Sequence, residues 1–505
     1  MPPHIYTHVI HTAPTPNPGS RLGLSAVDIT VILIYLAVIT GFGIWLSRFQ
    51  TDSRAYFLGN RNIPWWAICL SVVATETSVL TFIGVPALSY AGDLQFLQLA
   101  LGFLLARILL AAWFLPAFLE RDTYTVYSFL SDRFGGAVRG IAAGLFFVTQ
   151  VLGSGVRLYA GALVLAAVLG LEQVAWAIVV LAVVTIIYTW AGGISAVIWT
   201  DVLQAAIMLG GGVLALWLLV GMFPGGAGEV FTTAAAEGKL RLFDLRFDPG
   251  DMYSLWAGLI GGTVHGMASH GTDQMLAQRL LTSRSLSQGR KALICSGVII
   301  IPQFLLFLVI GVLLYYYYQL NPPSVAFENP DRIFLHFIIN HFPPVAAGLV
   351  VASMFGAAMS TLDSGIQALS STTVMDVIRP LSGGNRPREN YLGLSRAFTV
   401  FWGAALAGVA LMAGGWGSVL ETGLKVASYT YGPLLALFLL GLFSPIKGQR
   451  PVIFGAACGV AGIALVLAFT SLAWTWNVFV GCSITVAAAL LFDRFFTVSS
   501  RNKTA

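Results

Sequence analysis

Hydroxyl side chains and one carboxylate are concentrated in the middle of a long apolar run, in "GAAMSTLDSGIQALSSTTVMD" (356–376). On a helix, positions i, i+3, i+4 and i+7 share one face, and here they are occupied by Ala357, Ser360, Thr361 and Ser364. Asp363 lies at the edge of this face. Hydroxyl and carbonyl oxygens are hard ligands that suit a weakly held alkali cation. The stripe therefore predicts a Na⁺ site, although a single hydroxyl of this kind more often bonds back to its own helix.

The facing oxygen atoms are predicted to come from a second apolar segment, which contains "ATETS" (74–78) and then Pro86. A helix that breaks at this polar stretch leaves backbone carbonyl groups unpaired. In a membrane this is tolerated only where the carbonyls line a cavity. A third segment, 253–280, contains several glycines, two histidines and Asp273 and is a poor continuous helix for the same reason. We expect the Na⁺ site where the first break faces the hydroxyl stripe.

The elements that must position these residues are membrane helices. Of the 505 residues, 57% are hydrophobic and 10% charged, and the mean hydropathy is +0.82, whereas soluble proteins have about 25% charged residues. About 20 apolar residues cross the hydrocarbon core. The fold class predicted by this rule is an all-α polytopic membrane protein with about thirteen spans, near 26–47, 64–90, 95–119, 139–168, 173–190, 194–220, 253–280, 292–320, 344–378, 392–413, 417–441, 451–471 and 473–492.

The lysines and arginines are distributed unequally between the two sides of these spans. One set of connections holds 19 of them and the other set holds 5. Basic residues mark the cytoplasmic side. We therefore expect the amino-terminal tail, 1–25, outside and the carboxyl-terminal tail, 493–505, in the cytoplasm, with the protein in an inner (plasma) membrane. The longest connection, 221–252, has no room for a catalytic domain, so we expect no enzyme.

The spans divide into two similar sets. Five spans follow from each interrupted segment, giving 64–220 and 253–441. Since five is odd, the two sets must have opposite topology. Two such halves are typical of an inverted-repeat transporter whose binding site lies at the bilayer midplane. The helix 26–47 and a pair of helices in 451–492 would be additions to this core.

Four stretches give the chain a resemblance to the sodium/solute symporter family. They are "GNRNIPWWAICLSVVATETSVLTFIGVPALSYAGD" (59–93), "TWAGGISAVIWTDVLQ" (189–204), "GTDQMLAQR" (271–279) and "AAMSTLDS" (357–364). The resemblance covers roughly 26–490. It implies a LeuT-type fold, a five-plus-five inverted repeat whose first helix is broken in each repeat, with Na⁺ as the coupling ion. Members of the family carry sugars, proline, sialic acid, pantothenate, monocarboxylates or iodide.

The resemblance also implies a ligand set for sodium. The main site would use the backbone of Ala74, Thr77 and Ala357 and the side chains of Ser360 and Thr361. Some relatives hold a second sodium near the aspartate of the "WTD" motif. Here the matching residues would be Asp201, Ser360, Asp363 and Ser364. Relatives with that second site often have a serine where this chain has Asp363, so the extra carboxylate could strengthen the site or replace the sodium with a proton.

The resemblance places the solute in a cavity between the second, third, fourth, seventh and eleventh spans. The matching positions are Glu76, Ser78, Thr81, Gln95, Phe96, Gln98, Gln150, His270 and Tyr429. Arg157, a mid-span basic residue, is a further candidate because a guanidinium holds a carboxylate well. The structural alternatives are an ion pair between Arg157 and Glu76 and a packing role for His270. Arg107, among apolar neighbours, is interpreted as structural.

Together these observations predict a Na⁺-coupled symporter that imports a small organic solute by alternating access through the lipid membrane. The solute would be a carboxylate such as sialic acid or a monocarboxylate, a sugar, or an amino acid. A proton-coupled transporter of the same fold and a non-transporting solute sensor are the alternatives. Nucleic acid is not an expected partner.

Overall fold

The computed structural model describes residues 24–120, 123–323, 327, 330–382, 391–414 and 419–501. The regular elements in these ranges are helices, apart from one isolated bridge between Ile63 and Ser283. Those long enough to cross a membrane alone are α1 (Ala26–Leu46), α5 (Leu97–Leu119), α7 (Gly136–Leu169), α8 (Val174–Gly221), α12 (Leu286–Leu320), α14 (Ala346–Thr372), α16 (Leu392–Ala413), α18 (Gln449–Phe469) and α19 (Trp474–Arg501).

The remaining helices are shorter, interrupted or less apolar. They are α2 (Ser53–Leu58), α3 (Trp65–Glu76), α4 (Val79–Ala91), α6 (Tyr127–Phe134), α9 (Gly226–Ala236), α10 (Gly262–Gly271), α11 (Gln274–Leu281), α13 (Arg332–His341), α15 (Arg379–Leu381) and α17 (Val419–Phe443). Short 3₁₀ or π-helical turns lie at Ser47–Phe49, Gly59–Arg61, Ala257–Gly261 and Thr373–Ile378.

The count of thirteen spans is not confirmed as such. In the described residues nine helices are long and apolar enough to cross a membrane, or ten when α3 and α4 are taken together. The difference has physical causes, since predicted spans two and seven are interrupted and spans five and six join in α8. Every predicted span nevertheless contains helix.

The first span of each predicted half is broken, as the polar residues within it require. The axes of α3 and α4 differ by 58°. In the second half, a π-helical turn leads into α10, and Thr272 and Asp273 separate α10 from α11. The Asp273 side chain accepts a hydrogen bond from the Met275 amide and so caps α11. At both breaks, polar groups of the chain lie in the interior of the protein.

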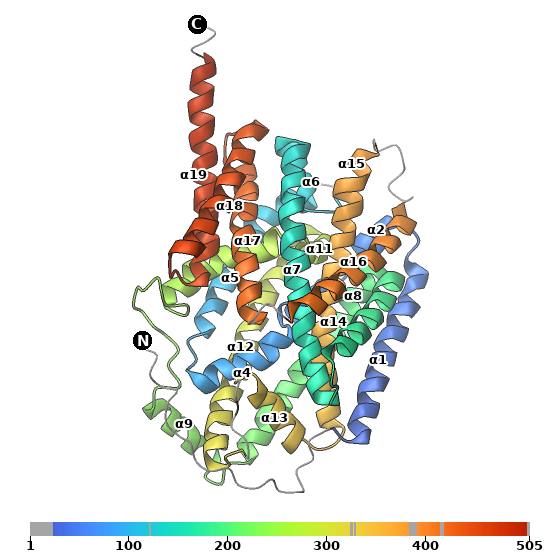
Figure 1. The fold of residues 1–505 in the computed structure, drawn as a ribbon, viewed down its shortest axis with the longest axis vertical. Coiled ribbons are helices and arrows are strands. Elements are labelled where there is room, and N and C mark those ends of the chain that lie inside the picture. Colours follow the sequence, from blue (N-terminus) through green and yellow to red (C-terminus); the bar gives the residue numbers. More distant parts are fainter. Residues whose placement is uncertain are drawn as a thin grey trace.

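The kink within α8 depends on one glycine. Gly193 has φ 55° and ψ −153°, a backbone conformation that L side chains rarely adopt. A Cβ there would lie 2.6 Å from the Tyr56 carbonyl oxygen. The kink therefore joins predicted spans 173–190 and 194–220 in one bent element, which Figure 1 shows beside α1 and α14.

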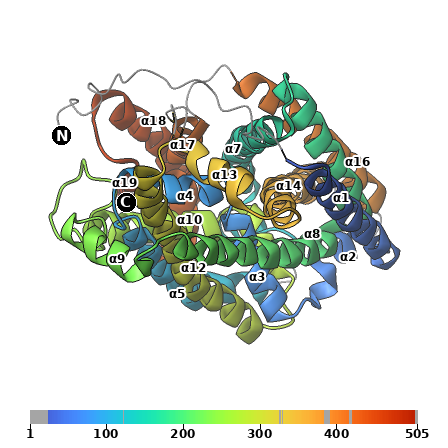
Figure 2. The ribbon, with the colours of Figure 1, turned by 90° about the horizontal axis from the view of Figure 1, so that it is seen from below.

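The hydroxyl stripe lies on the most enclosed long helix. In the apolar window of the span that starts with α14, 94% of the residues are buried, against 28% for α1, α16 and α18. Figure 2 shows α14 among α1, α7, α8 and α13. Since a helix surrounded by protein has no lipid-facing side, its polar residues must be satisfied by other helices or by bound ions.

The additional helices flank the core on opposite sides. Figures 1 and 2 both place α1 on one side of the molecule and α18 with α19 on the other. The predicted tail 1–25 lies almost wholly outside the described residues, and the tail 493–505 is described only to Arg501. The division into repeats and the orientation in the membrane remain predictions.

Candidate functional site

The break between α3 and α4 frees the backbone carbonyls that the sequence predicts as ion ligands. In a continuous helix the Ser78 amide would pair with the Ala74 carbonyl, but here it donates to the Glu76 carbonyl at 3.1 Å. Likewise, the Thr81 amide donates to the Ser78 carbonyl at 2.9 Å rather than to that of Thr77. Two carbonyl oxygens, those of Ala74 and Thr77, are thus released from the helical ladder. Such carbonyls are suited to a hard monovalent cation.

The Thr77 side chain is used in hydrogen bonds within the protein, so the ligand predicted at this position is its backbone carbonyl. Its hydroxyl donates to the Val73 carbonyl at 2.8 Å and accepts from the amide of Gln303 on α12. This hydroxyl is therefore engaged, and its residue is fully buried. The predicted ligand at this position is the backbone oxygen, which is consistent with that geometry.

The hydroxyl stripe is buried on the α14 side. Ala357, Ser360 and Thr361 are all at most 3% exposed, and α14 packs against α3. The Thr361 hydroxyl donates to the Ala357 carbonyl at 3.2 Å, and the Ser360 hydroxyl donates to Asp201 at 2.5 Å. Each hydroxyl retains acceptor lone pairs. The five residues of the predicted main site thus belong to two helices in contact, one of which ends at this point.

The predicted second cation site is built around Asp201, which is fully buried on α8. One of its oxygens accepts from Ser360, and the other accepts from Ser71 at 2.5 Å and from Arg279 at 2.9 Å. The Arg279 guanidinium also donates to Ser71, to the Met275 carbonyl and to Ser364. The sequence analysis did not select Arg279, which it counted among the cytoplasmic basic residues. Its position in the last turn of α11 brings it into the interior.

Asp363 adds a second carboxylate to this buried cluster. It accepts from the Tyr188 hydroxyl at 2.5 Å and from the Ser364 hydroxyl at 2.9 Å. Asp363, Asp201 and Arg279 are each fully buried. With both carboxylates ionised the three side chains sum to one negative charge. A buried unbalanced charge is costly, so one more monovalent cation or a proton on a carboxylate would balance this cluster.

A second buried cluster links the two broken helices. Arg107 on α5 donates to the Glu76 carboxylate at the end of α3, and its guanidinium is 3.0 Å from the His270 Nε2 on α10. That imidazole nitrogen is 3.5 Å from the same carboxylate. Glu76 is therefore paired with Arg107 and not with Arg157, the partner considered in the sequence analysis. Glu76 remains partly accessible at 13% of its side chain, whereas Arg107 is fully buried.

Arg157 lies near groups that the sequence did not identify. Among the described residues the mid-membrane ion pairs engage Arg107 and Arg279 but not Arg157, which is half-buried on α7. Its guanidinium lies beside the hydroxyl of Tyr431, which donates to Asp273 at 2.9 Å. The ring of His265 is 5.6 Å from that of Tyr431. The Asp273 carboxylate is near enough to interact electrostatically with Arg157, but the guanidinium forms no ion pair among the described residues and can bind an anionic group of a solute.

The predicted residue Tyr429 occupies a different face of α17. It is 38% exposed, whereas Tyr431 is buried. Two residues apart on a helix correspond to roughly opposite faces, so Tyr431 and not Tyr429 faces Asp273.

The other predicted solute residues lie on α7 or at the start of α4 and α5. Ser78 and Thr81 are half-buried in the first turn of α4. Gln150 is buried and donates to Ser154 at 2.6 Å. Gln95 donates to Asp93 at 2.7 Å, and the ring of Phe96 is 5.3 Å from that of Phe304. Gln95 and Phe96 are half-buried and precede α5.

Gln98 is engaged by the loop that covers this end of α5. Its amide donates to the Tyr253 carbonyl at 2.5 Å and accepts from the Asp244 amide at 3.3 Å. Hydrogen bonds from Arg246 hold the pKa of Asp244 well below its usual range, so this loop carboxylate is ionised at neutral pH. Gln98 thus has a structural partner on each side, whereas the Thr81 hydroxyl makes one long hydrogen bond, at 3.5 Å to the Glu76 carbonyl.

The fold and these polar interruptions define a class of protein, a cation-coupled secondary transporter with broken membrane helices. A family model described as the sodium:solute symporter family matches residues 56–459. The human sodium/iodide cotransporter is 31% identical over 88% of this chain and 70% of its own length. The sodium/sialic acid symporter of Proteus mirabilis is 30% identical over 86% and 88%, and human sodium-coupled monocarboxylate transporter 1 is 30% identical over 82% and 68%. This chain belongs to the sodium:solute symporter family.

Solved structures agree with this assignment. A Na⁺-coupled sialic acid symporter in a substrate-bound outward-open state matches with a TM-score of 0.86 and 26% identity, over 93% of this chain and 98% of the other. A nucleobase-cation-symport family transporter matches with a TM-score of 0.54 at 12% identity, which is a likeness of fold alone. The predictions of the family, of Na⁺ as its ion and of an integral membrane transporter are confirmed.

Proposed function

We propose that this protein imports a small organic carboxylate together with Na⁺. The single observation that carries the proposal is the pair of carbonyls, of Ala74 and Thr77, that the α3–α4 break frees. The hydroxyls of Ser360 and Thr361 lie on the helix packed against this break. Sodium bound there would hold the broken helix against α14 and favour the state that accepts solute from outside.

The carboxylate preference rests on Arg157. It is the mid-membrane arginine outside the two buried ion pairs of the described residues. Ser78 and Thr81, half-buried at the start of α4, would supply hydroxyl donors to the same solute. The sialic acid and monocarboxylate transporters among the relatives carry solutes of this chemistry by name. Neutral sugars, which have no carboxylate, would make no use of Arg157.

The test is the thermal stability of the purified protein in NaCl and in choline chloride, with sialic acids, monocarboxylates, sugars and amino acids. A ligand at 100 times its Kd adds about 2.7 kcal/mol of stability. We expect one carboxylate to stabilise the protein only when sodium is present. Stabilisation by a solute that is equal in choline would instead favour proton coupling or a solute sensor.

A matched pair of variants connects this result to the proposed site. Ser360→Ala with Thr361→Ala should raise the half-saturating sodium concentration about tenfold or more, because lost interactions with a charged group cost about 1.5–3 kcal/mol. Ser353→Ala is the control, since that hydroxyl lies on the same helix and bonds back to the Val350 carbonyl at 2.6 Å. Equal effects of the two changes would exclude the sodium site at α14.

A further inference from the structure

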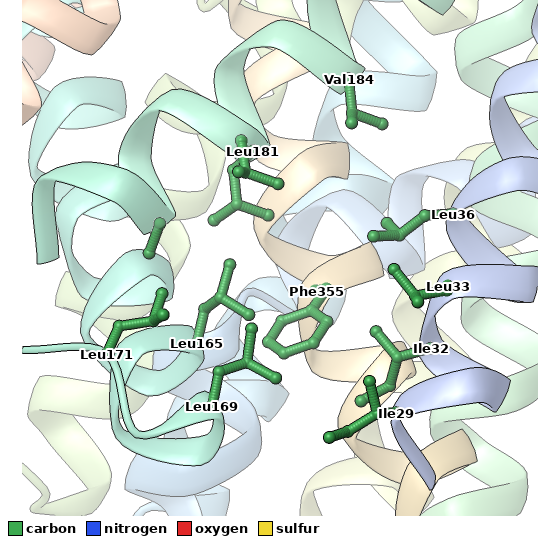
Figure 3. Close-up of a pocket in the computed structure, with 12 residues that line it drawn as sticks. Ile29, Ile32, Leu33, Leu36, Leu165, Leu169, Leu171, Leu181, Val184 and Phe355 are labelled. Carbon is green, nitrogen blue, oxygen red and sulfur yellow. The ribbon is translucent and has the colours of Figure 1, made fainter. Parts of the chain in front are cut away.

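An apolar cavity with a volume of about 230 Å³ lies between α1, α7, α8 and α14 (Figure 3). All twelve lining side chains are aliphatic or aromatic. Figure 3 shows Ile32 and Leu36 of α1 on one side, Leu165 of α7 on the other, and Phe355 of α14 at the back. No part of the proposed ion and solute sites lines this cavity.

The cavity opens toward lipid. Two of its lining residues, Leu33 and Val180, are 60% and 45% exposed, and they belong to helices that qualify as membrane spans. The cavity is therefore continuous with the hydrocarbon-facing surface of the protein. An unfilled apolar void deprives its lining of dispersion contacts, and the molecules in contact with this surface are acyl chains.

We propose that this cavity is a binding site for one acyl chain of a membrane phospholipid. The lining contains no donor or acceptor side chain, so a polar solute would lose its hydrogen bonds on entry. A hydrocarbon chain loses none and gains contact with both walls. Because those walls belong to α1 and to the α7–α8 pair, the chain fastens the additional amino-terminal helix to the transport core.

The bound chain also contacts the helix of the proposed sodium site. Phe355, in the cavity wall, is two residues before Ala357 and is 1% exposed. Filling the cavity restricts the movement of this part of α14 against α1. The lipid site stands independently of the proposed function. Its expected influence on sodium affinity rests on that function.

Neighbouring valines on α8 provide a matched pair of variants. Val184 lines the cavity, whereas Val183 is 48% exposed and does not. Val184→Phe fills part of the cavity, and Val183→Phe adds the same ring to the outer surface. Both proteins are placed in lipid nanodiscs that contain a phosphatidylglycerol with a photoreactive diazirine in one acyl chain, in choline chloride so that sodium plays no part.

After irradiation, adducts are mapped by mass spectrometry. We expect adducts within 165–184 that persist when unlabelled lipid is added in excess. Val184→Phe should lower them about tenfold, since losing the burial of about two methylene groups has that effect, and Val183→Phe should leave them unchanged. Adducts in 165–184 that exchange as fast as those on α16, or that survive Val184→Phe, would overturn the proposal.

A second measurement covers the case in which Val184→Phe disturbs the fold. The proteins are stripped of lipid in detergent, and their thermal unfolding is followed as the phosphatidylglycerol is returned. We expect the wild type and Val183→Phe to regain stability and Val184→Phe to change little, because its ring already fills the space. An equal gain in all three would show that lipid acts elsewhere. If lipid binding is lost while sodium affinity is unchanged, the lipid site stands and only its proposed effect on sodium binding through α14 is overturned.

Discussion

The Asp201–Arg279 ion pair and Arg157 differ in accessibility, and this difference bears on which arginine could bind a solute. Asp201 and Arg279 are both fully buried and share Ser71 as a further partner, and Arg279 also donates to Ser364. Arg157 is half-buried and belongs to neither ion pair. An arginine that is fully buried and paired with a carboxylate stabilises the fold, whereas a half-buried arginine outside the ion pairs can bind a solute.

Arg157→Ala should raise the KM for a carboxylate solute about 10- to 100-fold, because the charge-assisted hydrogen bonds of a guanidinium contribute about 1.5–3 kcal/mol. Uptake into proteoliposomes measures this change. Arg157→Lys keeps the charge but loses the planar pair of donors and should lie between Ala and wild type. Sodium binding, measured by thermal stabilisation in NaCl without solute, should not change. A parallel loss of sodium stabilisation would assign Arg157 to the fold.

Arg279→Met should lower the free energy of unfolding by about 3–5 kcal/mol, since it leaves the buried Asp201 carboxylate without its cation. The double variant Arg279→Met with Asp201→Asn removes both charges and should recover part of that loss. Thermal unfolding of the purified proteins provides the comparison. Additive losses in the double variant would mean that the two side chains, 2.9 Å apart, contribute independently.

The elements that carry the site are defined by where helices break. The α3–α4 break releases two carbonyls, and the α10–α11 break places Asp273 in the non-helical turn that follows His270 and the end of α10. The kink in α8 has a different cause, the positive φ of Gly193. It separates Tyr188, which binds Asp363, from Asp201, which binds Arg279, and so directs both side chains toward α14.

Gly193→Ala should destabilise the protein by about 1–3 kcal/mol, the cost of holding a residue in a sparsely populated backbone conformation. The added Cβ also has to avoid the Tyr56 carbonyl. Gly210→Ala is a control in the same helix, because its Cβ would meet nothing within 4 Å and alanine favours the helix. Thermal unfolding distinguishes the two. Similar stability of both variants would show that α8 does not need its kink.

At the scale of the whole molecule, the charge of the ion sites decides how membrane voltage drives transport. Moving one elementary charge across 100 mV releases about 2.3 kcal/mol. A monovalent carboxylate with one Na⁺ moves no net charge, whereas a second cation makes the cycle electrogenic. With both carboxylates ionised, Asp201, Asp363 and Arg279 sum to one negative charge, which a second sodium or a proton would balance.

Uptake of a monovalent carboxylate should therefore increase with an inside-negative potassium diffusion potential, by up to about 50-fold in accumulation at 100 mV. Asp363→Ala removes both the charge and the oxygen ligand and should remove this voltage dependence while leaving uptake dependent on sodium. Proteoliposomes with and without valinomycin give the comparison. Voltage-independent uptake by the wild type would indicate one sodium per carboxylate, and voltage-driven uptake by Asp363→Ala would place the second cation elsewhere.

The sequence by itself determined the membrane class, the family and the residues around the hydroxyl stripe. These features can be predicted because their signals are local. A long apolar run indicates a helix in lipid, and hydroxyls at i, i+3, i+4 and i+7 lie on one helix face whatever surrounds that helix. Tertiary structure decided the partners, because contacts between segments far apart depend on packing. In the folded protein Glu76 pairs with Arg107 rather than with Arg157, and Arg279 pairs with Asp201. Tyr431, rather than the predicted Tyr429, contacts Asp273. It also formed the cavity between α1 and α8, whose apolar residues look like any others in the sequence.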